Sequence, residues 1–145
     1  MPATAPFDAA AMLQYVNTMV QALPTLQQSY IGVSEAIAAK VNAWVTLGDC
    51  TPSPQATQTV RREPEVVVTF VYRVAGDQQA AELGICALVD ELTAAIYADR
   101  SLGGTSQNAT LDMSLNRDPA YMNVSVAEVR RYIAIVRGLQ TTNTP

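Results

Sequence analysis

The chain has 145 residues, of which 49% are hydrophobic and only 15% are charged. This length fits one domain. The charged fraction is well below the roughly 25% of a typical domain. Because interface cores are depleted in charge, we expect partner proteins to cover much of the surface. Thirteen acidic and nine basic side chains leave a net charge of −4, which argues against broad affinity for nucleic-acid phosphates.

Membrane and export segments are not predicted. The longest apolar run, residues 66–74, is far too short to cross a bilayer. Residues 1–13 lack a basic region and include Asp8, unlike a signal peptide. Cys50 and Cys86 are too far apart for a paired-cysteine motif, so we expect buried free thiols. These features predict a chain made in a cytosol, with no membrane partner.

The first predicted helix begins at Asp8, a residue type that caps helices, and ends or kinks at Pro24. Its apolar side chains recur with a helical period at Met12, Val16, Met19 and Leu23. Residues 25–40 show only a weak periodicity of apolar residues, so no regular element is predicted there. From residue 41 to 47 the apolar residues alternate, which predicts a first strand.

Residues 48–63 contain two prolines and several hydroxyl residues, a composition that favours a long, solvated hairpin loop. We expect residues 51–63 to be mobile in the free subunit and to order on assembly. The strongest predicted strand follows at residues 65–74, where β-branched residues dominate. Its near-continuous apolarity predicts a central position in the sheet.

A second amphipathic helix is predicted to run to about Asp99, with its apolar stripe at Ala81, Ile85, Leu88, Val89, Leu92 and Ile96. Gly103 and Gly104 then permit a sharp reversal. Strands are predicted at residues 111–115 and 129–137, with an irregular segment at 117–124. The polar tail, residues 138–145, is expected to fray.

Together these elements predict an α+β fold, with an antiparallel or mixed sheet of about four strands and two main helices packed on one face. The chain is expected to form a single domain over residues 1–145, with an ordered core at about 7–137.

Catalytic chemistry finds little support in the sequence. There is no histidine, so the commonest general base and a frequent metal ligand are absent. Asp90, Glu91, Asp99 and Asp112 occupy ordinary surface positions of the predicted elements. Residues 103–105 lack the lysine of a phosphate-binding loop. We therefore expect no enzyme activity, cofactor or metal.

Candidate interface residues are few. Two pairs of adjacent arginines occur, at residues 61–62 and 130–131. Because adjacent residues of a strand face opposite ways, each pair places one charge on each face of its strand. These charges serve either surface solubility or a contact with a partner. Tryptophan at position 44 is expected to pack on the sheet or to anchor a partner. The candidates are Trp44, Arg61, Arg62, Gly103, Gly104 and Arg130.

Three segments together resemble siphophage tail-terminator proteins. They are Tyr-Ile-Gly-Val-Ser-Glu at residues 30–35 before a strand, the strand at 66–74 that feeds an amphipathic helix, and Asp-Arg-Ser-Leu-Gly-Gly-Thr at 99–105 before a late strand pair. The arrangement of these segments that carries the resemblance spans roughly residues 7–137. Ser34 departs from the pattern, where a proline is expected.

The resemblance implies a ring, commonly a hexamer, that binds the last ring of the tail tube, stops tube polymerisation and offers a docking face to the head connector or stopper protein. It implies a virion protein of the tail neck, assembled in the host cytoplasm. The acidic balance would let genomic DNA slide through the lumen without binding.

Other functions stay open at this point. They are another neck component such as a head-closure protein, a small α+β ligand-binding module, and an enzyme that uses two carboxylates. A ligand module would have a closed apolar pocket, and an enzyme would have two convergent acids in a cleft.

Overall fold

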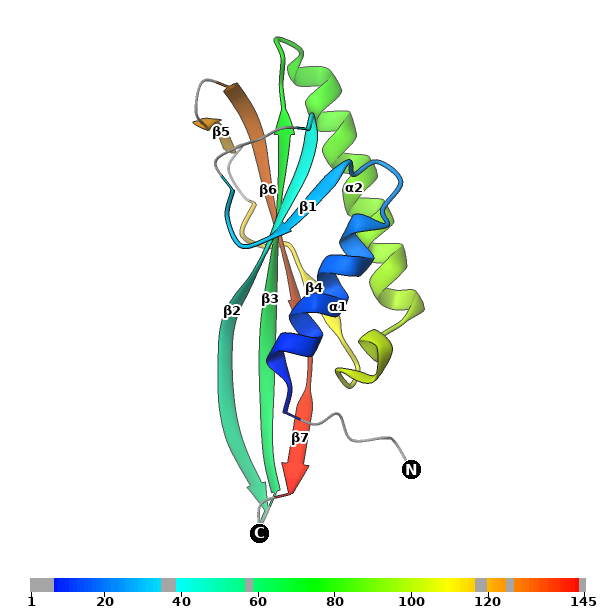
Figure 1. Ribbon diagram of the computed structural model, residues 1–145, viewed down its shortest axis with the longest axis vertical. Helices are drawn as coiled ribbons and strands as arrows, with labels where there is room; N and C mark the ends of the chain where they lie inside the picture. The colour runs from blue at the N-terminus through cyan, green and yellow to red at the C-terminus, as the bar shows by residue number, and fades with distance from the viewer. Residues whose placement is uncertain (1–6, 35–38, 57–58, 117–119, 125–126, 144–145) are drawn as a thin grey trace.

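The computed structural model describes residues 7–34, 39–56, 59–116, 120–124 and 127–143 (Figure 1). Two helices lie on one side of a mixed seven-stranded sheet, which confirms the α+β class with more strands than expected. In chain order the elements are α1 (Ala9–Gln21), β1 (Gln28–Ile31), β2 (Val41–Ala56), β3 (Thr59–Arg73), α2 (Gln78–Ala98), the 3₁₀ turn η1 (Leu102–Gly104), β4 (Thr110–Asp112), β5 (Ala120–Val124), β6 (Ala127–Arg137) and β7 (Gln140–Asn143).

The strand order is β1-β2-β3-β6-β4, with β5 also paired to β6 and β7 also paired to β3. β1 runs parallel to β2, and the other pairs are antiparallel. β3 is therefore central, as its apolar sequence predicts, with β2 along one edge and β6 followed by β7 along the other.

Both helices begin where the sequence places a capping aspartate. Asp8 accepts a hydrogen bond from the backbone N–H of Ala11 at 2.9 Å, and Asp77 accepts one from Ala80 at 3.0 Å. Each carboxylate satisfies a backbone donor that the first helical turn leaves unpaired. The predicted stripes are largely buried, at Met12, Val16 and Leu23 around α1 and at Ala81, Ile85, Leu88, Leu92 and Ile96 in α2. Met19 and Val89 are only half-buried, and the buried Val20 lies outside the predicted stripe.

The core lies between the helices and the face of β3 that carries Val66, Val68, Phe70 and Tyr72. Gly84 lets α2 approach this face closely, because a Cβ built there would lie 2.3 Å from the Tyr72 ring. The opposite sheet face has a small apolar cluster of its own, formed by Trp44, Val71 and Val129.

The prediction of a solvated loop at residues 48–63 is wrong. β2 continues to Ala56 and β3 begins at Thr59, with a register shift between Leu47 and Cys50. Among the described residues, β2 pairs with β1 only as far as Val45. Pro52 therefore lies in an edge strand, where the missing N–H breaks no ladder bond. Residues 57–58 lie outside the described part of the chain.

These long strands form an extension, here called the arm, made of residues 48–56 of β2, 59–64 of β3 and the whole of β7. Figure 1 shows the arm projecting past the ends of both helices. The predicted fraying of residues 138–145 is wrong as far as residue 143, because β7 pairs with β3 from Arg62 to Thr59. Residues 144–145 lie outside the described part.

Several smaller expectations also change. β1 comes from the stretch with a weak pattern, and β5 comes from the segment predicted to be irregular. The predicted strand at 111–115 is shorter, ending at Asp112. The cysteines are not buried, since Cys86 is exposed and Cys50 is half-buried. Residue 35 of the first resemblance segment and residues 117–119 are not described.

Candidate interaction surfaces

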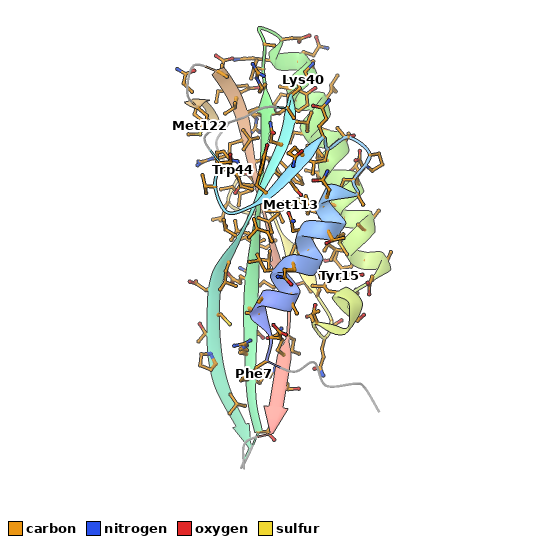
Figure 2. All side chains as sticks on the ribbon, in the orientation of Figure 1. Phe7, Tyr15, Lys40, Trp44, Met113 and Met122 are labelled. Carbon is orange, nitrogen blue, oxygen red and sulfur yellow. The ribbon has the colours of Figure 1, made fainter. Side chains whose placement is uncertain are left out.

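Arg62 makes its contacts within the chain. Its guanidinium donates two hydrogen bonds to Gln140 Oε1, at 3.0 and 2.8 Å, and lies 4.4 Å from the centre of the Phe7 ring. The amide nitrogen of the fully buried Gln140 in turn donates to the backbone oxygens of Asp8 and Thr105. Figure 2 places Phe7 beside the arm, below α1. Arg62 thus fastens the arm to the start of α1.

Arg61 occupies the opposite face of β3, because successive strand residues alternate. It is half-buried and lies in register with Ser53 of β2 and Thr141 of β7. The sequence predicts that this doublet divides between the two faces, and the structure places its members in that way.

Arg130 is also held internally and is only 7% exposed. Its Nε lies 2.5 Å from Glu82 Oε2 of α2, and its guanidinium lies close to the rings of Tyr121 and Tyr132. The hydrogen bond from Arg130 is the main cause that holds the pKa of Glu82 below its usual value. This ion pair joins α2 to β6. No local sequence pattern predicts it, because Glu82 and Arg130 are 48 residues apart in the chain.

Gly103 and Gly104 form the sharp turn that the sequence predicts, with φ angles of 65° and 87°. Gly103 N–H donates to the Asp99 carboxylate at 3.1 Å, and the Tyr15 hydroxyl donates to the same carboxylate at 2.5 Å. A Cβ at Gly103 would lie 2.4 Å from the Tyr15 ring. The glycine therefore serves the packing of α1 against this turn.

Trp44 packs on the sheet face that lies away from the helices (Figure 2). It is 9% exposed, and its Nε1 has no hydrogen-bond partner. Two other buried polar atoms on this face are also unpaired, Asn42 Oδ1 and Arg131 Nε. Since the indole ring of Trp44 is covered within the chain, sheet packing is the role that the geometry supports.

An apolar groove of about 540 Å³ runs between α1 and α2 and opens to the surface. Beside it, Glu91 accepts hydrogen bonds from the backbone N–H and the hydroxyl of Thr25. The groove is lined by Tyr15, Thr18, Met19, Ala22, Leu23, Pro24, Glu91, Ala94 and Ala95. It is not the closed pocket expected of a small-molecule module.

Two acidic side chains, Asp112 and Glu65, are paired with Arg137. Asp112 is bonded to Ser114 and to Arg137, which lower its pKa to about 2. Arg137 also lies 3.0 Å from Glu65. Within the described ranges, no group of three or more His, Cys, Asp or Glu residues could hold a metal ion.

In the described part of the chain, no helix combines the length and the apolar character needed to cross a membrane.

The fold defined by these elements is an α+β fold with both helices on one face and a projecting strand arm, and it is similar to that of a terminator protein. The similar solved structure is the sheath/tube terminator, in its extended state, of PVC, an extracellular contractile injection system. The TM-score is 0.51 at 10% sequence identity, and the match covers 97% of this chain but 61% of that chain. This likeness establishes the fold alone.

No protein-family model matches the sequence. No curated protein matches it either.

Proposed function

We propose that this chain is a tail terminator, a structural subunit that caps the end of a tail tube as a ring and stops its polymerisation. The observation that carries the proposal is the terminator-like fold over 97% of the chain. The tail-terminator resemblance of residues 30–35, 66–74 and 99–105 is an independent reason, because it rests on sequence alone.

The shape of the subunit supports this role. The arm projects beyond the helices (Figure 1) and is fastened at its base by Arg62 and Gln140. The strands of the arm are already hydrogen-bonded to one another and held against α1 before any partner binds. The arm can therefore contact a neighbouring ring with little loss of conformational entropy. The expected mobility of residues 51–63 is therefore not needed for docking.

The proposed partners are other copies of the chain in a hexameric ring, the tail tube protein, and a head connector or stopper protein. Genomic DNA passes through the lumen without specific binding. The particle is a virion whose neck contains this ring, assembled in the host cytoplasm. The proposed role is structural and not enzymatic.

The test is a tube-length assay. The tube protein of the same particle is polymerised with and without this chain, and tube lengths are measured by electron microscopy. We expect shorter tubes with a ring of additional density at one end. Unchanged lengths and bare ends at a molar excess of this chain would contradict the proposal.

A second experiment separates this role from that of another neck component. Particles that lack the chain should have overlong tails if it is a terminator. Tails of normal length that fail to join heads would instead identify a head-closure protein.

A further inference from the structure

Two apolar patches lie at opposite lateral edges of the sheet. The first, here called the β1-side patch, consists of Ile31, Val33 and Leu47, which are 52%, 69% and 49% exposed. The second, the β4-side patch, consists of Tyr97 and Leu115, which are 47% and 62% exposed. Large apolar side chains gathered at an edge and exposed to this degree are typical of protein contacts.

The strand register places both patches at the same level along the sheet. One row of paired residues crosses from Leu47 through Val66 and Val136 to Leu111. Tyr97 lies at the far end of this row, because its hydroxyl accepts the Leu111 N–H at 3.4 Å. The β1-side and β4-side patches therefore face outward at matching heights.

The next row on the same face of the sheet gives the same result. Ile31 pairs with Val45, which continues through Val68 to Ala134. At the other end, the Asn116 side chain bonds the backbone N–H and oxygen of Ile133, next to Ala134. Leu115, beside Asn116, thus lies level with Ile31.

Charge is complementary between the patches. Asp49 is exposed two residues beyond Leu47. Arg100 is exposed on the other side, with its guanidinium 5.4 Å from the centre of the Tyr97 ring. An acid beside one patch and a base on the other allow an ion pair when the two patches meet.

Side chains already bond some of the backbone groups at these edges, which favours a contact made through side chains over strand addition. Gln21 Oε1 accepts the N–H of Ser29 in β1 at 2.8 Å, and Asn116 occupies the backbone groups of Ile133 in β6. Prolines 52 and 54 remove donors from the arm portion of β2. Edge strands whose backbone groups are bonded by side chains or lack donors are less able to pair with a strand of another chain.

We propose that the β1-side patch of one copy docks on the β4-side patch of the next copy. The contact joins two different surfaces, so it repeats from subunit to subunit, and such a contact closes into a ring when it carries no axial shift. Because the two patches lie at the same level along the strands, a contact between them carries no axial shift. The inference deepens the proposed function by assigning the surfaces of the ring contact.

Site-specific cross-linking tests the pairing of the patches. In a Cys50→Ala, Cys86→Ala background, Val33→Cys and Leu115→Cys are made separately and together, and a short bismaleimide is added. The double-cysteine chain should give a ladder that ends at the ring size. A mixture of the two single-cysteine chains should give covalent dimers and nothing larger. Dimers from either single-cysteine chain alone, or none from the mixture, would overturn the proposal.

A charge exchange provides the second arm of the test. Asp49→Arg or Arg100→Asp alone should weaken association at least tenfold in sedimentation, and the double variant should restore it. Thermal midpoints are measured for each variant, because Arg100→Asp also removes the hydrogen bond from Arg100 Nε to the backbone oxygen of Ala109 at 3.1 Å. Failure of the double variant to recover any association would contradict the contact between Asp49 and Arg100.

The outcomes separate this inference from the proposed function. Rings of normal size from both Val33→Asp and Leu115→Asp would overturn the patch contact and leave tube capping intact. Wild-type chains that stay monomeric up to about 1 mM would also overturn it, since a dissociation constant above that value is worth less than about 4 kcal/mol. Rings that use these patches but do not cap tubes would overturn the proposed function alone.

Discussion

The hydroxyl of Tyr15 donates a hydrogen bond to the carboxylate of Asp99 at 2.5 Å, which joins the middle of α1 to the end of α2. Asp99 also accepts hydrogen bonds from the Ser101 hydroxyl and the Gly103 N–H. The bond from Tyr15 is the largest cause of the lowered pKa of Asp99, and the same bond raises the pKa of Tyr15. One carboxylate thus links two helices and the turn between α2 and β4.

Tyr15→Phe should lower the free energy of unfolding by about 1 kcal/mol, because it removes a hydrogen bond to a charged acceptor that is only partly shielded from water. Urea unfolding at pH 7 measures the change. Tyr97→Phe is the matched control, since its hydroxyl makes only a 3.4 Å contact with Leu111 N–H. Equal effects of the two substitutions would contradict the special role of Tyr15.

Stability should fall in acid as Asp112 is protonated. The pKa of this carboxyl is lowered from 3.8 to about 2, first by Ser114 and then by Arg137. A lowered pKa in the folded state gives stability that is present above the unfolded value and is lost as pH falls through the folded value. The loss should therefore occur between about pH 4 and pH 2.

Asp112→Asn should remove this part of the pH dependence, which is measured as the urea midpoint against pH. Glu82 and Asp99 also have lowered pKa values and contribute in the same direction, so the wild-type decline should become shallower and not vanish. An identical decline in the variant would show that Asp112 does not contribute.

Arg62→Ala should weaken the arm, whereas Arg61→Ala should not. Removal of the Arg62 guanidinium leaves the Oε1 of the buried Gln140 without its two donors. A buried acceptor left unpaired costs about 1–3 kcal/mol. Hydrogen exchange of the β7 amides should accelerate in the Arg62 variant, together with a lower thermal midpoint.

Arg61→Ala is the control, because it removes the same charge from the neighbouring position of the same strand. It should change stability by less than about 0.5 kcal/mol, as is usual for a surface substitution. If both variants leave β7 exchange unchanged, Arg62 does not fasten the arm.

Leu88→Ala should lower the free energy of unfolding by about 2–5 kcal/mol, the usual cost of truncating a buried leucine. Leu88 is fully buried between α2 and the sheet. Leu83→Ala, on the exposed surface of the same helix, should have little effect. A thermal midpoint that does not change in the Leu88 variant would show that this stripe is not part of the core.

Local patterns in the sequence determined the two helices and the central strand. Asp8 and Asp77 cap their helices through residues three positions away, and the apolar stripes follow from a period set by the helix itself. The alternation of Val66, Val68 and Phe70 likewise depends only on strand geometry. These features need no knowledge of distant contacts.

Tertiary structure decided the arm and the environment of the arginines. Pro52 is compatible with β2 only because the neighbouring edge is unpaired, and the polar residues of β7 form a strand only because β3 supplies its partners. Arg130 is buried because Glu82, Tyr121 and Tyr132 converge on it from different elements. The level placement of Leu47 and Tyr97 depends on the register of four strands, which long-range pairing sets and no local pattern encodes.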